Sequence, residues 1–151
     1  MKRFLILICA MALLAFGGVA VGATKGKKTS GVAYAGVTHA EGNDLFVSGD
    51  FKDKVLGRGG IVYITNVRAG EAQGEYEVTA RKITIYTAKG SLTGKGSATQ
   101  VFHEDGSTEV KDGVFNLNKG TGKYKGHSLK GTFAGPQTNG VYKFTYSGTY
   151  K

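Results

Sequence analysis

Beyond its N-terminal segment, the sequence lacks several residues on which protein chemistry often depends. It has one cysteine, one proline and no tryptophan. Cys9 lies within an apolar run that we expect to be removed, which would leave no thiol for a disulfide or for thiol chemistry. Pro136 is expected in a loop. No Gly-x-Ser-x-Gly motif occurs, so the nucleophile elbow of α/β-hydrolases is excluded.

The chain also lacks an apolar run long enough to cross a membrane. The longest one, from Phe4 to Phe16, has about 13 residues, whereas a spanning helix needs roughly 20. It follows Lys2 and Arg3 and precedes small residues that end at Ala23, which is the layout of a secretory signal peptide. We therefore predict a signal peptide over residues 1–23, a flexible basic leader over 24–30 and a protein that is secreted or periplasmic in a bacterium, without a membrane anchor after cleavage.

Helical periodicity is likewise absent after Ala23, and short β-branched and aromatic runs take its place. Glycine-, asparagine- and aspartate-containing turns separate these runs, with turns expected at 104–106 and 111–113. The pattern predicts a single all-β domain over residues 31–151, an eight-stranded antiparallel β-barrel, because closure removes exposed edge strands. The expected strands cover residues 32–40, 44–51, 60–67, 75–88, 96–104, 113–120, 128–135 and 140–150.

The last of these runs has the clearest alternation. Tyr142, Phe144 and Tyr146 share one face of the strand, while polar residues dominate the other. Tyr63 and Tyr86, in two earlier runs, are candidates for further aromatic walls. Because an eight-stranded barrel is either filled by side chains or holds one small ligand, the five rings either form the core or line a lumen for a small apolar ligand.

Glu75, Glu77 and Arg81 are candidate polar residues that share one face of a predicted strand. Two neighbouring carboxylates can perform acid–base chemistry when one is buried. The alternative is an outward polar stripe with a cross-strand ion pair. The sequence leaves both arrangements open.

The sequence predicts no metal site, no cofactor and no nucleotide site. His39, His103 and His127 do not occur at spacings typical of paired zinc ligands. The glycine-rich segment at 120–126 has one residue too many for a dinucleotide loop, and a strand-like run follows it instead of a helix. Its glycines are therefore expected in turns and close contacts between strands.

The chain carries a formal net charge of +9, which suits an anionic partner. Lys123, Lys125 and Lys130, together with Tyr124, are candidates for contact with an anionic glycan or surface. The alternative is an ordinary soluble surface with an excess of lysine.

Several segments resemble the barrel shared by allene oxide cyclases and dirigent proteins. Residues 120–124, Gly-Thr-Gly-Lys-Tyr, are similar to the dirigent turn Gly-Gly-Thr-Gly-x-Phe, and residues 129–131, Leu-Lys-Gly, follow as Ala-Arg-Gly does there. The run at 75–86 resembles the long central strand of the cyclases, and 141–150 resembles their aromatic strand. The resemblance covers roughly residues 57–151 and is closest to secreted bacterial members with this turn.

This resemblance implies an eight-stranded barrel, often trimeric, that holds a reactive apolar substrate in one conformation. Lys130 stands where dirigent proteins use an arginine, and the first strand has no carboxylate before Glu41, where the cyclases use a glutamate. Two functions follow as hypotheses. The first is a non-catalytic binding or scaffold module for a small apolar ligand or an anionic surface, and the second is a cyclase- or dirigent-like enzyme.

Overall fold

The described part of the chain, residues 25–151 of the computed structural model, forms a closed eight-stranded antiparallel barrel. This confirms the predicted architecture; the predicted signal peptide, residues 1–23, lies outside the described residues. Each strand pairs with its neighbours in the sequence, and β1 closes the barrel against β8. The strands are β1 (Lys27–Glu41), β2 (Asp44–Asp53), β3 (Gly57–Ala69), β4 (Glu75–Thr87), β5 (Gly90–Phe102), β6 (Thr108–Gly120), β7 (Leu129–Thr138) and β8 (Val141–Tyr150).

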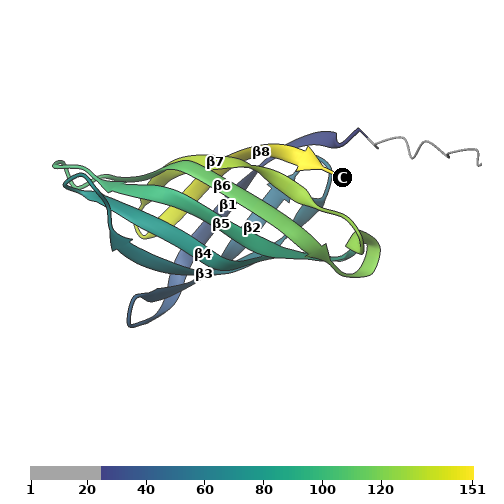
Figure 1. The fold of residues 1–151 in the computed structure, drawn as a ribbon, viewed down its shortest axis with the longest axis horizontal. Helices are drawn as coiled ribbons and strands as arrows, with labels where there is room; N and C mark the ends of the chain where they lie inside the picture. The colour runs from purple at the N-terminus through teal and green to yellow at the C-terminus, as the bar shows by residue number, and fades with distance from the viewer. Residues whose placement is uncertain (1–24) are drawn as a thin grey trace, which may run out of the picture.

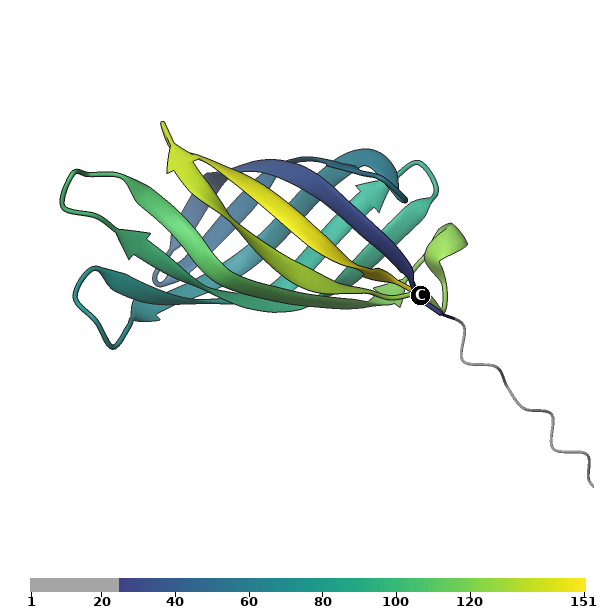
Figure 2. The same cartoon turned by 90° about the horizontal axis from the view of Figure 1, so that it is seen from above.

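The barrel is elongated, and its two ends differ (Figure 1). The β1–β2, β3–β4, β5–β6 and β7–β8 hairpins lie at one end, which we call the mouth end. The other end, which we call the closed end, has the chain's C-terminus and the 3-10 helix η1 (Gly122–Tyr124). Seen from above, the strands run obliquely to the long axis, as barrel closure requires (Figure 2).

The predicted leader at 24–30 is wrong over its second half, because β1 already begins at Lys27. Lys27 to Ser30 pair with Tyr150 to Ser147 of β8, so these residues complete the closure of the barrel. Thr29 is buried there, and its hydroxyl is hydrogen-bonded inside the protein. A polar, lysine-rich composition therefore concealed a strand whose burial comes from its pairing and not from apolar side chains.

Most other predicted strand boundaries lie within three residues of the observed ones, but the starts of two strands move further. β5 begins at Gly90 and not at 96, and β6 begins at Thr108 and not at 113. The expected turn at 111–113 is a β-bulge within β6, where Asp112 has a φ of 53°. Pro136 lies within β7, in register with Glu109, and not in a loop.

A bulge in β4 reverses which residues of that strand face the interior. Ala80 pairs with Gly96 of β5 and Ile83 with Gly94, so β4 contains one residue more than its partner over this interval. Because strand side chains alternate, the extra residue moves every later residue to the opposite face. Ala80, Ile83 and Ile85 consequently all face the interior.

The glycine-rich segment at 120–126 forms the connection that covers the closed end. Gly122 has a φ of +57°, and a Cβ placed there would lie 2.4 Å from the carbonyl oxygen of Lys89. A side chain at this position would therefore be both strained and obstructed. The turn allows Tyr124 to enter the core, where it is 5% exposed. The prediction that these glycines serve turns and close packing agrees with this geometry.

Apolar side chains pack most closely toward the closed end. Leu56, Leu92, Leu117, Tyr124 and Leu129 are all buried in one hydrophobic cluster. Leu92 is fully buried among them. Among residues 25–151, no helix is long and apolar enough to span a membrane.

Candidate functional site

The barrel encloses an apolar cavity of about 110 Å³. Its walls come from all eight strands, so the cavity depends on closure of the whole sheet. Most of the lining side chains are aliphatic or aromatic, and none is a lysine, arginine, histidine or carboxylate of the described chain. The aliphatic walls include Leu45, Val47, Ile61, Val67, Val78, Ile83, Ile85, Val110, Leu117 and Leu129.

A wider depression of about 560 Å³ opens at the mouth end. Gly42, Asn43, Tyr76 and Phe102 line it, among other residues. Tyr76 and Phe102 are partly exposed and contact one another edge to face, with ring centroids 5.3 Å apart.

The depression and the cavity share four lining residues, which form a neck between them: Leu45, Val67, Gln100 and Tyr142. Two of these are aliphatic and two carry polar groups. Gln100 and Tyr142 are each 6% exposed, whereas Leu45 and Val67 are partly buried. The cavity therefore adjoins the depression at the mouth end.

Four of the five aromatic residues proposed for the lumen line the cavity: Tyr63, Tyr142, Phe144 and Tyr146. Phe144 stacks on Tyr142 with ring centroids 5.4 Å apart and meets Phe133 edge to face at 5.3 Å. These rings therefore pack against one another and also border the cavity, and binding of a ligand against them stays a prediction.

The fifth residue, Tyr86, is not part of the lumen. It lies on the outer surface and is 49% exposed. Glu75 and Glu77 face outward, so uninterrupted alternation along β4 would place Tyr86 inside. The bulge at Arg81 adds one residue, and the residues after it therefore face the opposite way. Ile85 occupies the inward position instead.

A buried carboxylate lies beside the cavity at its closed end. Asp53 is 5% exposed and accepts hydrogen bonds from the Thr29 hydroxyl at 2.7 Å and from the Tyr146 hydroxyl at 3.0 Å. It also accepts from the backbone N–H groups of Val55 and Leu56, at 2.6 Å and 2.7 Å. These bonds join β1, β2, β8 and the β2–β3 loop, so Asp53 fixes the closed end of the barrel.

Sequence analysis missed Asp53 and Thr29. The available signal was local: an aspartate at a strand end often accepts hydrogen bonds from N–H groups two and three residues later. That signal describes Val55 and Leu56 but gives no indication of Thr29 or Tyr146, which are remote in the sequence.

The three tyrosine hydroxyls near the cavity differ in their partners. Tyr146 donates to Asp53, and both burial and this carboxylate raise the pKa of Tyr146. Burial raises the pKa of Tyr142, with the neighbouring Gln100 amide opposing the shift. The Tyr63 hydroxyl is buried and has no hydrogen-bond partner among the described residues, and burial raises its pKa strongly.

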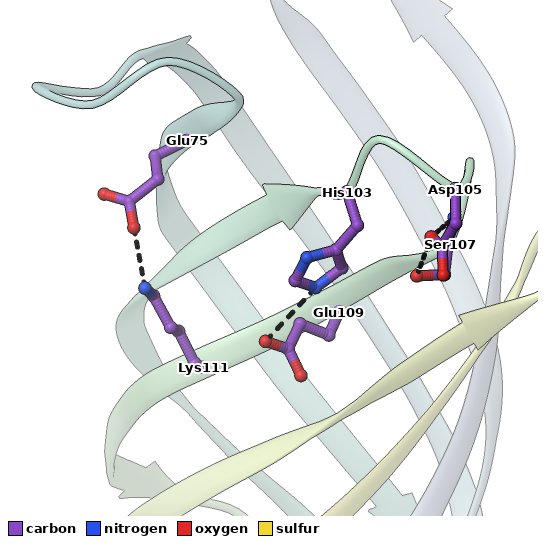
Figure 3. A network of polar contacts seen from close by, with 6 residues as sticks. All are labelled: Glu75, His103, Asp105, Ser107, Glu109 and Lys111. Carbon is purple, nitrogen blue, oxygen red and sulfur yellow. Dashed lines mark hydrogen bonds and ion pairs between the residues drawn. The ribbon is translucent and has the colours of Figure 1, made fainter.

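The proposed polar residues lie on the outer surface and do not line the cavity. Glu75 accepts a hydrogen bond from the Lys111 ammonium at 2.6 Å, across β5 (Figure 3). Arg81 pairs with Asp44, and Glu77 is exposed. They therefore form the outward polar stripe with cross-strand ion pairs, and not a polar floor inside the barrel.

The same close-up shows the other polar contacts of the mouth rim. His103 Nε2 lies 3.4 Å from Glu109 Oε1, and Ser107 donates to Asp105 at 2.6 Å (Figure 3). These side chains are exposed and are spread along the β5–β6 hairpin. Within residues 25–151, no group of three histidine, cysteine or acidic side chains is placed to hold a metal ion.

Charges are distributed unevenly between the two ends of the barrel. Lys54, Lys89, Lys123 and Lys125 are exposed on the connections of the closed end. The side-chain carboxylate found there, Asp53, is buried and hydrogen-bonded. Most acidic residues belong instead to the mouth end: Glu41, Asp44, Glu71, Glu75, Glu77, Glu104, Asp105 and Glu109.

Tyr124 cannot take part in a surface for glycans as the sequence suggested. Its ring is buried, and its hydroxyl is hydrogen-bonded to Thr87 Oγ1 at 2.8 Å. Lys123, Lys125 and Lys130 remain exposed around it. The closed end therefore offers cations without an accessible ring from Tyr124.

The site thus combines an apolar cavity, a depression that adjoins it at the mouth end, and the buried Tyr63 hydroxyl, which has no partner among the described residues. Comparisons with protein-family models, with curated proteins and with solved structures gave no match.

Proposed function

We propose that this protein is a non-catalytic binding module that holds one small apolar ligand inside its barrel. The observation that carries the proposal is the apolar cavity of about 110 Å³, which is reached from the mouth end. Burial of an apolar molecule there removes its surface from water without requiring charged partners. The proposal includes export of the protein to the periplasm or the medium, on the basis of residues 1–23.

The size of the cavity limits the ligand to a small molecule. Apolar cavities of about 150 Å³ in protein cores bind benzene or xenon, so a single six-membered ring sets the scale of the ligand. The aromatic rings of Tyr142, Phe144 and Tyr146 give such a ligand flat surfaces to contact. A larger ligand would require the neck residues to move.

We expect toluene to shift the NMR signals of the isoleucine methyl groups that face the cavity. Ile61, Ile83 and Ile85 line it, whereas Ile64 lies on the same strand as Ile61 but is not part of the lining. A titration should therefore move the first three signals in a saturable way and leave Ile64 in place. Replacement of Ala80 by leucine should fill part of the cavity and weaken this binding by about tenfold or more.

Two results would contradict this proposal. One is the absence of saturable shifts at any of the three inward isoleucines. The other is an equal response in the Ala80→Leu variant, provided that its melting temperature shows that it is folded.

A cyclase- or dirigent-like enzyme is the alternative to a pure binding module. The closed eight-stranded barrel and its apolar cavity support this alternative. It would carry with it the trimeric assembly that the resemblance implies. Such an enzyme acts mainly by positioning its substrate and excluding water, which an enclosed apolar lumen achieves. The Tyr146–Asp53 pair would supply one polar group to a substrate held there.

A second function, contact with an acidic glycan, is favoured by the cations of the closed end. Lys54, Lys89, Lys123 and Lys125 lie on neighbouring connections, and the acidic residues lie mostly at the opposite end. An anionic partner would therefore approach the closed end and leave the mouth accessible.

The glycan hypothesis predicts that heparin, as a polyanionic probe, binds through the closed end. The double variant Lys123→Gln, Lys125→Gln should lose affinity on the order of tenfold at constant salt, since two ion pairs are removed. The control Lys82→Gln, Lys95→Gln lowers the net charge by the same amount. Its two exposed lysines lie on β4 and β5 and not on the connections of the closed end. Equal losses in the two variants, measured by salt elution from a heparin column, would show attraction to net charge alone.

A further inference from the structure

Tyr63 differs from the other polar residues that line the cavity, because its hydroxyl oxygen is both buried and without a hydrogen-bond partner among the described residues. The ring lines the cavity, and the hydroxyl oxygen is buried without a hydrogen bond among the described residues. Tyr146, by contrast, donates a hydrogen bond to Asp53. Tyr142 lies at the neck beside Gln100. Tyr63 therefore brings to the cavity wall a buried hydrogen-bond donor that no described group accepts.

A buried hydroxyl without a partner is energetically unfavourable in the free protein. The hydroxyl loses its hydration on folding, and no hydrogen bond among the described residues replaces it. A ligand oxygen that accepts a hydrogen bond from this hydroxyl would remove the penalty and would be favoured over a hydrocarbon of the same shape. The hydroxyl stays protonated at neutral pH, since burial raises the pKa of Tyr63, and it remains a donor.

The lining also determines what charge a ligand can carry. Among the described residues, the cavity wall holds no lysine, arginine or histidine that could balance an anion. The wall holds no carboxylate that could balance a cation either. The nearby Asp53 does not line the cavity, and its carboxylate already accepts hydrogen bonds from four donors, one of which is Tyr146. An ion placed there would lose its hydration without compensation.

We propose that the cavity selects a neutral, mainly apolar molecule with one hydrogen-bond acceptor, such as a carbonyl oxygen, which accepts a hydrogen bond from the Tyr63 hydroxyl. This inference rests on the proposed binding function and specifies the chemical class of the ligand. Tyr63 fixes the orientation of the molecule, and the aliphatic and aromatic walls provide most of its burial.

The test compares cyclohexanone with methylenecyclohexane, which has the same shape but lacks the acceptor. Binding is followed by the methyl signals of Ile61, Ile83 and Ile85 in the purified protein. Tyr63→Phe should weaken cyclohexanone binding by about threefold to tenfold and leave methylenecyclohexane unchanged. Its melting temperature should be equal to or above that of the wild type, because the removed hydroxyl had no partner. Cyclohexanecarboxylate should not bind at neutral pH.

Tyr124→Phe is the matched control. It removes a buried hydroxyl that is already hydrogen-bonded to Thr87 and that does not line the cavity, so it should lower the melting temperature without changing the preference for the ketone. An unchanged ketone affinity in Tyr63→Phe, or a lower melting temperature for that variant, would overturn the role of Tyr63. If neither cyclohexanone nor methylenecyclohexane shifts the inward methyl signals of the wild type, the binding function itself fails.

Discussion

Asp53→Ala is expected to lower the free energy of unfolding by roughly 3–5 kcal/mol, because several buried donors lose their acceptor together. The carboxylate accepts hydrogen bonds from two hydroxyls and two backbone N–H groups. Alanine replaces none of these interactions, and the contacts join both ends of the chain to the β2–β3 loop. Urea denaturation monitored by tyrosine fluorescence measures the change.

Asp50→Ala is the control for this prediction, since Asp50 lies on the same strand but is exposed. It should alter stability by no more than about 0.5 kcal/mol. Thr29→Val removes one of the four donors and should lower the free energy of unfolding by about 1 kcal/mol, which lies between the values for the two aspartate variants. If Asp53→Ala lowers the free energy of unfolding by no more than Asp50→Ala does, the hydrogen bonds of Asp53 do not stabilise the closed end.

Phe144→Ala is expected to destabilise the protein by about 3–5 kcal/mol and to enlarge the cavity. Phe144 is 8% exposed and packs against both Tyr142 and Phe133. Because the ring also lines the cavity, its removal leaves space that an aromatic molecule can fill. Benzene should therefore raise the melting temperature of Phe144→Ala more than that of the wild type, as ligand binding to the folded state requires.

Tyr86→Ala removes an aromatic side chain of similar size from the outer surface and serves as the control. The variant should lose about 0.5 kcal/mol of its free energy of unfolding, and benzene should raise its melting temperature no more than that of the wild type. A large loss of stability in Phe144→Ala, without stabilisation by benzene and without ligand binding by the wild type, would identify the rings as core residues of a structural barrel.

Local patterns in the sequence were sufficient for the class of fold. β-branched and aromatic runs separated by turn residues predicted eight antiparallel strands, because such side chains suit a pleated, half-buried surface. Strict alternation in β8 also placed Tyr142, Phe144 and Tyr146 on the inner face. No bulge interrupts that face, so a period of two was enough.

The tertiary structure decided which other residues reach the interior. The bulge at Arg81 reversed β4 and moved Tyr86 outside, and sequence alternation has no means of counting an extra residue in one strand. Thr29 and Asp53 became a buried pair only when β1 and β2 met at the closed end. The local pattern of runs and turns determined that a barrel forms. Strand register and closure determined the cavity, the depression beside it and the burial of the Tyr63 hydroxyl without a partner among residues 25–151, since these depend on contacts between residues far apart in the chain.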